Sequence, residues 1–325
     1  MSVTVEIKGY GYCKADKCVT NTDLMKIVDT SDEWIKERTG IEQRYFSTVD
    51  NTSDLGVKAA QMAILDASIN SNEIDLIIVA TITPDAMMPS TANLIQAKLG
   101  LNHQKCLAFD VNAACSGFLI ALQSAQAMIQ SGFAKNALVI GSETLSKILD
   151  FNDRTTCILF GDGAGAVVLG QSTNHSIMSH YSRSMGDLDE VLTTDGLSLN
   201  TNYTRDVKQS MFLHMKGQAV FRFAVKAMED AILELCKQEN LELNEIDWIV
   251  PHQANSRIIH HVASKLNINI EKFFINLNEY GNTSSASIPI ALANMKEKGY
   301  LKKDQKIILV GFGAGLTWAS SYYIS

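Results

Sequence analysis

Residues 108–118 read AFDVNAACSGF, an apolar run followed by small residues and then by the start of a long apolar stretch. This order predicts a strand, a tight turn and a helix, the unit from which α/β proteins are built. The turn places the thiol of Cys115 at the helix N-terminus, where free N–H groups and the helix dipole favour a thiolate. We therefore expect an α/β fold in which Cys115 is a candidate nucleophile.

A faint internal repeat extends this unit to the whole chain. Three pairs of segments match, at offsets of 168, 172 and 170 residues: 57–65 with 225–233, 72–77 with 244–249, and 139–142 with 309–312. One match could arise by chance, but three in the same order indicate two copies of one fold. We predict an N-terminal half over 1–172 that carries the nucleophile and a C-terminal half over 173–325.

Each half alternates helical patterns with apolar strands. The strands are expected near 75–82, 105–111 and 136–142 in the first half, and near 246–250, 272–276 and 306–312 in the second. Such alternation predicts mainly parallel sheets covered by helices. In this architecture, functional side chains gather at the carboxyl ends of the strands.

Two polar residues follow strands of the second half. His252 comes directly after the strand near 246–250, and Asn282 comes after the strand near 272–276. Taken alone, a histidine there is more often a structural helix cap, and an asparagine before Thr and Ser is ordinary turn chemistry. Together with Cys115, at equivalent strand ends of a duplicated fold, they form a candidate catalytic set.

Composition excludes several classes of protein. The 325 residues carry a net charge of −7, which argues against a nucleic-acid partner. No run of about 18 apolar residues is present, and the N-terminal residues alternate like a strand rather than a signal peptide. The six cysteines have neither CxxC nor zinc spacing, so we expect free thiols and no metal. These features predict a cytoplasmic protein without a membrane partner.

Four motifs carry a resemblance to a known family. They are DVNAACSG (110–117), PHQAN (251–255), GNTS (281–284) and GFGAGLTW (311–318). In this order and over essentially the whole chain, they resemble β-ketoacyl-acyl-carrier-protein synthase III, a condensing enzyme of the thiolase superfamily. The Cys–His–Asn set differs from the Cys–His–Cys of thiolases and the Cys–His–His of elongating ketosynthases. The resemblance implies a thiolase-like fold, with two duplicated α/β halves that form a five-layer αβαβα sandwich.

The resemblance also implies an activity. Cys115 would take an acyl group from acyl-CoA, and malonyl-acyl-carrier protein would then lose CO₂ and condense with it, which initiates fatty-acid synthesis. His252 and Asn282 would donate hydrogen bonds to the charge that decarboxylation creates, and the N–H groups of Cys115 and Ala314 would form a second oxyanion hole. The implied enzyme is a homodimer with no permanently bound cofactor; coenzyme A enters only as the substrate thioester.

A coenzyme A site is expected at residues 30–38. Thr30 and Glu33 have the spacing of a capping box, and Trp34 and Arg38 then share one helix face. An indole and a guanidinium placed so could sandwich an adenine ring, although an isolated cation–π pair without a ligand is the simpler interpretation. In the family, matching residues hold coenzyme A; the further matching positions are Arg154, Gly217, Phe221 and Asn255.

A basic patch is expected to dock the acidic carrier protein. Arg222 and Lys226 are one helical turn apart, and Arg257 follows the His252 motif. Charge spacing alone is equally consistent with an ordinary solvated helix face.

The acyl pocket shows where this chain departs from its family. Met88 stands where phenylalanine is common, at a position that closes the partner's acyl pocket, and Phe312 is assigned to the same pocket. Methionine is slimmer and more adaptable, so we expect primers longer or more branched than acetyl. Ala314 replaces a glycine of the family but still supplies an N–H.

Three other interpretations were weighed. The glycine-rich segment 161–166 resembles a dinucleotide fingerprint, but the apolar run after it predicts a strand rather than the required helix. A specialised homologue of secondary, polyketide-like metabolism would use the same three residues with another acyl donor or acceptor. A protein that only binds or hydrolyses acyl-CoA would not need the intact Cys–His–Asn set.

Overall fold

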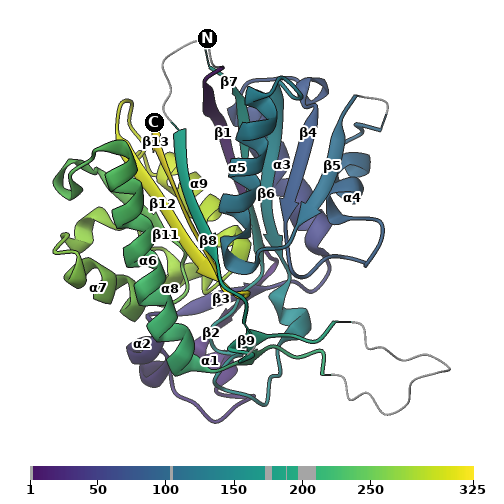
Figure 1. Ribbon diagram of the computed structural model, residues 1–325. Helices are drawn as coiled ribbons and strands as arrows, with labels where there is room; N and C mark the ends of the chain where they lie inside the picture. The colour runs from purple at the N-terminus through teal and green to yellow at the C-terminus, as the bar shows by residue number, and fades with distance from the viewer. Residues whose placement is uncertain (1–2, 103–104, 173–177, 188, 197–209) are drawn as a thin grey trace.

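The computed structural model describes residues 3–102, 105–172, 178–187, 189–196 and 210–325 (Figure 1). Two sheets organise the chain. The larger has the strand order β1 (Val5–Lys14), β7 (Gly163–Gln171), β6 (Asn136–Glu143), β4 (Leu76–Ala80) and β5 (Leu107–Val111). The smaller has the order β11 (Trp248–Pro251), β12 (Lys306–Gly313), β13 (Thr317–Ile324) and β8 (Met178–Ser184).

The sheets are mixed rather than mainly parallel. Strand β4 runs parallel to β5 and β6, and β11 runs parallel to β12. The remaining pairings are antiparallel, β1 with β7, β6 with β7, β12 with β13 and β13 with β8. Each half therefore keeps a parallel core at which chemistry can gather, and a closing hairpin adds the antiparallel strands.

Helices form three layers around the two sheets (Figure 1). The helices α5 (Gly117–Gln130) and α9 (Ser287–Glu297) lie between the sheets and share one apolar core with both. The helices α3 (Thr52–Asp66) and α4 (Thr91–Lys98) cover the outer face of the larger sheet. The helices α6 (Gly217–Glu239) and α7 (Ser256–Lys265) cover the outer face of the smaller sheet. This arrangement is the five-layer αβαβα sandwich that the family resemblance implies.

Alternating burial along single strands produces these layers. In β4, Leu76 and Ile78 belong to the central core, whereas Ile77 and Val79 belong to the core under α3 and α4. Because successive side chains of a strand point to opposite faces, one fully apolar strand contributes to two cores. The continuous apolar run at residues 76–80 is therefore the signature of a sheet covered on both faces.

Smaller elements complete the fold, most of them towards the lower end of Figure 1. They are β2 (Lys17–Thr20), α1 (Asn21–Leu24), α2 (Asp32–Thr39), β3 (Gln43–Phe46), β9 (Leu192–Thr193), β10 (His214–Met215) and α8 (Leu277–Tyr280). Short 3₁₀ helices lie at 71–73, 114–116, 145–148, 243–245, 270–272 and 284–286.

One strand prediction is wrong. Residues 272–276 do not form a strand: a 3₁₀ helix, Ile270–Lys272, leads to a single bridge between Phe273 and Ile249, and α8 follows. The side chain of Asn269 caps that turn by accepting from the N–H of Glu271, so only a short segment remains extended. Asn282 is therefore presented by the turn that follows α8 and not by the end of a strand.

The internal repeat is visible in the backbone. Strands β6 and β12, the 3₁₀ helices at 114–116 and 284–286, and the starts of α5 and α9 all correspond at an offset of 170 residues. The predicted boundary at 172/173 adjoins residues 173–177, which lie outside the described residues, so the division into 1–172 and 173–325 stays a prediction.

Candidate active site

Two equivalent turns meet at the centre of the molecule. We call residues 112–117 the Cys115 turn and residues 282–287 the Asn282 turn. Each contains a residue with left-handed backbone, Ala114 (φ 46°) and Ser284 (φ 50°). Each begins with an asparagine whose Oδ1 accepts from the N–H two residues later, at 3.4 Å for Asn112 and 2.8 Å for Asn282. Left-handed backbone is uncommon outside glycine and often marks functional sites.

The thiol of Cys115 is buried, with 7% of the residue exposed. It lies in the 3₁₀ helix Ala114–Ser116, one turn ahead of α5. Burial raises the pKa of Cys115 to about 12; the Ser284 hydroxyl lowers this pKa, and Glu143 raises it further. This direction is opposite to the thiolate that the helix N-terminus predicts. Cys115 is therefore a thiol at rest and needs a base when it reacts.

His252 can serve as that base because its imidazole is neutral. Burial lowers the pKa of His252 to about 3. Its Nδ1 lies 2.7 Å from the hydroxyl of Ser287, while its Nε2 is buried and has no hydrogen-bond partner among the described residues. The Ser287 hydroxyl can donate to Nδ1 or accept from it, so Nε2 can carry a proton or accept one.

The backbone bonds of Asn282 hold it rigidly. Its N–H donates to the Leu159 carbonyl at 2.8 Å, and its own carbonyl accepts from the N–H of Gly161 at 3.0 Å. Because Oδ1 accepts from Ser284, the orientation of the amide is fixed and its NH₂ group points away from that bond. The arrangement leaves the Asn282 NH₂ as a donor for a ligand.

The three candidate residues belong to one site. The 3₁₀ helix of the Cys115 turn contacts both that of the Asn282 turn and β12. His252 is joined to β12 by a bond from its N–H to the Val310 carbonyl at 2.7 Å, and its ring packs against Phe312 with 5.4 Å between ring centroids. A buried thiol, a neutral imidazole and a fixed amide thus lie on segments that pack together, and these groups are suited to acyl transfer with oxyanion stabilisation.

The predicted oxyanion loop lies against the Cys115 turn. A Cβ at Gly313 would stand 2.7 Å from the nitrogen of Cys115, so only glycine permits this approach. The hydroxyl of Thr317 bonds to the Ala314 carbonyl at 3.2 Å and to the Ser116 hydroxyl at 2.8 Å, which ties the loop to the turn. The role of the N–H groups of Cys115 and Ala314 stays a prediction.

The structure brings three of the predicted coenzyme A residues together. The guanidinium carbons of Arg38 and Arg154 lie 5.7 and 5.3 Å from the ring centroid of Trp34. The cap of α2 differs from the prediction: Ser31, not Thr30, accepts from the N–H of Trp34. Two cations beside one half-buried indole form a platform that suits a flat ring bearing phosphates.

The remaining predicted contacts lie on α6 and α7. Asn255 caps α7 by accepting from the N–H of Arg257, and its NH₂ group donates to the Arg38 carbonyl at 3.0 Å. It therefore links α7 to α2. Gly217 begins α6, and Phe221 packs edge-on against the ring of His261 at 5.9 Å between centroids.

The predicted docking patch is exposed. Arg222 and Lys226 lie on α6 and Arg257 lies on α7, and all three side chains face solvent. The two helices pack against each other. Nothing in these contacts identifies a partner.

The two predicted acyl-pocket residues differ sharply in exposure. Phe312 is 4% exposed and packs between His252 and Phe223, with 6.2 Å between the centroids of the two phenylalanine rings. Met88 is 84% exposed, in the loop between β4 and α4. Within one protomer, the structure does not bring Met88 into the site that Phe312 lines.

The glycine-rich segment 161–166 has a packing role. Residues from Gly163 onward form β7, so no helix follows the glycines. A Cβ at Gly165 would stand 2.5 Å from the nitrogen of Ile290 on α9, and Asp162 accepts bonds from Ser47 and Ser146. The predicted strand after the glycines is confirmed, so the segment lacks the helix that a dinucleotide fingerprint requires.

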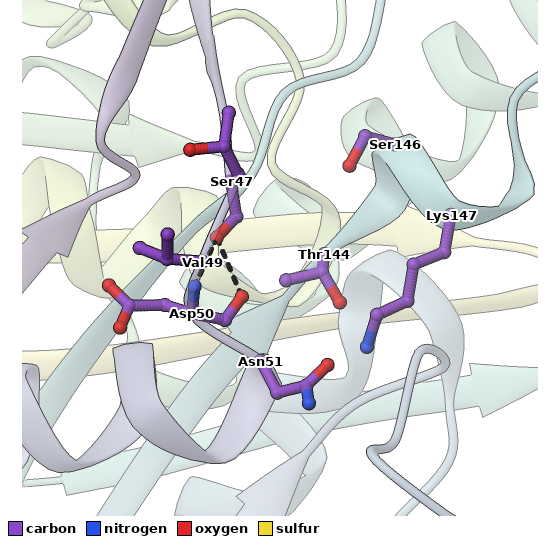
Figure 2. Close-up of a pocket in the computed structure, with 8 residues that line it drawn as sticks. Ser47, Val49, Asp50, Asn51, Thr144, Ser146 and Lys147 are labelled. Carbon is purple, nitrogen blue, oxygen red and sulfur yellow. Dashed lines mark hydrogen bonds between the residues drawn. The ribbon is translucent and has the colours of Figure 1, made fainter.

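A separate polar cavity of about 190 Å³ lies beside the N-terminus of α3 (Figure 2). Its hydroxyl groups are already committed: Ser47 donates to the Asp50 carbonyl, Ser146 donates to Asp162, and Thr144 bonds to Thr52. We assign no ligand to it. In the part of the chain that the structure describes, no cluster of His, Cys, Asp or Glu could hold a metal ion, and no helix is long and apolar enough to cross a membrane.

Sequence reasoning missed three residues of the site. Ser287 bonds to His252, Ser284 approaches the thiol, and Glu143 bonds to the hydroxyl of Ser285 at 2.8 Å. A signal was available, because the repeat at an offset of 170 residues pairs Cys115 with Ser285 and Glu143 with Gly313. Using that alignment requires knowing that the two turns adopt one backbone.

Comparison with known proteins gives a consistent result. Two family models match: the 3-oxoacyl-[acyl-carrier-protein] synthase III model over residues 109–186, and the C-terminal model of the same family over residues 236–323. A β-ketoacyl-[acyl-carrier-protein] synthase III of Clostridium tetani is 52% identical over 312 residues, 93% of each chain.

Solved structures agree in fold. The 3-oxoacyl-[acyl-carrier-protein] synthase III of Aquifex aeolicus superposes with a TM-score of 0.92 at 42% identity, over 99% of this chain and 100% of that one. The priming β-ketosynthase of the R1128 polyketide biosynthetic pathway gives a TM-score of 0.92 at 31% identity, over 99% and 96% of the two chains. The predicted thiolase-like α/β fold is therefore confirmed.

Proposed function

The chain belongs to the β-ketoacyl-[acyl-carrier-protein] synthase III family, and on that premise we propose that Cys115, His252 and Asn282 carry the two half-reactions of the enzyme. The enzyme is an acyltransferase that initiates condensation in fatty-acid synthesis, with acyl-CoA as a substrate. The observation that carries the residue assignment is the convergence of the Cys115 turn, the Asn282 turn and β12.

The first half-reaction acylates Cys115. His252 Nε2 accepts the thiol proton as sulfur attacks the acyl-CoA carbonyl, and the C–S bond to coenzyme A then breaks. The departing coenzyme A thiolate takes the proton back from Nε2. Because the pKa of His252 is lowered to about 3 and that of Cys115 is raised to about 12, proton transfer must accompany attack rather than precede it.

The second half-reaction forms the carbon–carbon bond. The malonyl thioester loses CO₂, and the electron pair of the broken bond spreads onto the thioester oxygen. Between the half-reactions the neutral imidazole exchanges its proton with solvent, so that Nε2 carries the hydrogen and Nδ1 accepts from the Ser287 hydroxyl. His252 Nε2–H and the Asn282 NH₂ then donate to that oxygen, and neither group is acidic enough to quench the carbanion. The carbanion then attacks the acyl–Cys115 carbonyl, and the thiolate that leaves takes up a proton. Each donor is expected to contribute roughly 10²–10³ in rate.

We further propose how the substrates reach the site. The Trp34–Arg38–Arg154 platform holds the adenine end of coenzyme A, with Gly217, Phe221 and Asn255 along the path to Cys115. The acidic carrier protein docks on Arg222, Lys226 and Arg257. Arg257→Glu should raise the KM for malonyl-carrier protein about tenfold without changing acylation by acyl-CoA. Lys8→Glu, a matched charge reversal on β1, should change neither.

A homodimer is supported by the free edge of the larger sheet. Strand β5 is the last strand in that sheet, and Leu107 on it is 42% exposed. Open strand edges invite pairing with another chain. Met88, 84% exposed in one protomer, would then reach the partner's acyl pocket. The six free thiols and the substrates further support a cytoplasmic location.

Primer choice follows from Met88. Its flexible side chain leaves more room than phenylalanine, so four- to six-carbon acyl-CoAs should be used faster than acetyl-CoA. The direct test of the proposed function is the mass of the protein after mixing with these acyl-CoAs. A gain of one acyl group in the wild type, absent in Cys115→Ala, is expected; an adduct that persists in Cys115→Ala would overturn the assignment.

A further inference from the structure

Glu143 is a buried carboxylate that the reaction described above does not use. It is the last residue of β6, has 0% exposure, and occupies the position that corresponds to Gly313 in the repeat. Its oxygens accept from four donors: Thr81 Oγ1 at 3.1 Å, the N–H of Ile82 at 3.1 Å, Thr83 Oγ1 at 2.6 Å and Ser285 Oγ at 2.8 Å. A carboxylate can accept from all four, and the single hydroxyl hydrogen of Ser285 is shared between Oε1 and the Ala80 carbonyl.

The carboxylate divides its bonds between two segments. Oε2 holds residues 81–83, which lead directly into the loop that carries Met88. Oε1 holds Ser285, which lies three residues after Asn282 and two before Ser287, the partner of His252. The Ser285 hydroxyl also reaches the Ala80 carbonyl at 2.8 Å. One side chain therefore fixes the Asn282 turn relative to residues 81–83.

Packing alone does not account for a carboxylate here. Glu143 forms none of the ion pairs found among the described residues, and burial raises its pKa. A buried acid without a cation is costly, and apolar or amide side chains of similar size fill such spaces at lower cost. What the carboxylate adds is four directed bonds that residues 81–83 and Ser285 must satisfy together.

We propose that Glu143 is a positioning residue for the carbanion half-reaction. It does not touch the reacting atoms: it holds Ser285, and through the Asn282 turn it sets the amide of Asn282, which serves the carbanion half-reaction alone. This inference rests on the proposed function and refines it. A purely structural carboxylate would instead support both half-reactions equally.

The test separates the half-reactions in the full-length enzyme. Ser285→Ala removes the bond to Oε1, and Thr81→Val, the matched control, removes one hydroxyl from Oε2. We expect Ser285→Ala and Glu143→Gln to slow CO₂ release from malonyl-carrier protein about 10–100-fold, through kcat rather than KM. Acylation of Cys115 by acyl-CoA should stay within about twofold of wild type, and Thr81→Val should keep both rates within about threefold.

Three outcomes decide the matter. A parallel loss of both half-reactions, or unchanged CO₂ release in Ser285→Ala and Glu143→Gln, would overturn the positioning role while leaving the proposed function intact. A wild-type enzyme that neither acylates Cys115 nor releases CO₂ would contradict the proposed function, and the positioning role with it. Recovery of at least half of the lost kcat in Glu143→Asp would support the carboxylate as the acting group.

Discussion

The Cys115 turn and the Asn282 turn share a backbone and differ in what faces them. Opposite the Cys115 turn, β12 ends in Gly313, so the loop approaches the Cys115 nitrogen closely. Opposite the Asn282 turn, β6 ends in Glu143, whose carboxylate bonds to Ser285, the counterpart of Cys115. The duplicated fold thus provides two equivalent positions, 115 and 285. Gly313 leaves position 115 open, whereas the carboxylate of Glu143 bonds to the residue at position 285.

The two turns also differ in the role that their structure suits. The open turn holds a thiol that can be acylated. The occupied turn is immobilised, with both backbone groups of Asn282 bonded and its amide orientation fixed. Rigid donors stabilise developing charge without reorganisation, so the Asn282 turn is suited to stabilise the carbanion.

The largest effect should come from removing the thiol. Cys115→Ala should abolish the acyl adduct and lower condensation by at least ~10⁴-fold, because nothing else can carry the acyl group. Intact mass and product formation measure both quantities. Residual condensation within tenfold of wild type would mean that Cys115 does not carry the acyl group.

His252→Ala should cost roughly 10²–10³ in CO₂ release, since it removes one oxyanion donor. Because the pKa of His252 is lowered to about 3, the imidazole stays neutral from pH 5 to pH 8. The rate of CO₂ release should therefore show no inflection near pH 6.5. An inflection there that disappears in His252→Ala would contradict a buried neutral base.

The lowered pKa values of two buried histidines predict how the stability of the fold depends on pH. Burial lowers the pKa of His180 to about 4 and that of His252 to about 3, both below the unfolded value of about 6.5. The unfolded chain therefore binds more protons in this window. Stability is fully present above pH 6.5 and falls as pH drops toward 4. Chemical unfolding at several pH values checks this, and stability that rises on acidification would contradict it.

A glycine pair tests the packing difference between the turns. A Cβ at Gly141 would stand 2.3 Å from the Ser285 carbonyl oxygen, whereas one at Gly311 would stand 3.7 Å from the Cys115 carbonyl oxygen. Gly141→Ala should lower the free energy of unfolding by about 1–3 kcal/mol, and Gly311→Ala by less than about 1 kcal/mol. Equal decreases in the free energy of unfolding, measured in urea, would contradict the packing difference between the two turns.

The smallest effect is expected from moving the nucleophile. Ser285→Cys in a Cys115→Ala background should yield no acyl adduct, because Glu143 covers that position and its charge disfavours a thiolate. Mass measurement after incubation with acyl-CoA checks this. A clear adduct on residue 285 would show that the occupied turn is still accessible.

Much of this site could be predicted from local sequence. The strand–turn–helix unit around Cys115, the repeat and the motifs at 252 and 282 each depend on residues close in the chain. The pKa of Cys115 could not, because burial by distant segments outweighs the helix N-terminus. The structure of residues 272–276 and the hydrogen bonds of Glu143 could not be predicted for the same reason. Both depend on partners that lie 24 to 142 residues away in the chain.

The central claim is that the Cys115 turn carries the acyl group and the Asn282 turn handles the carbanion. Its most direct test is CO₂ release from malonyl-carrier protein by Cys115→Ala and by Cys115→Ala/Asn282→Ala. We predict that the single variant retains release within about tenfold of wild type, whereas the double variant loses a further 10²–10³-fold or so. Loss of CO₂ release on removing the thiol alone, or equal rates in the two variants, would contradict the account.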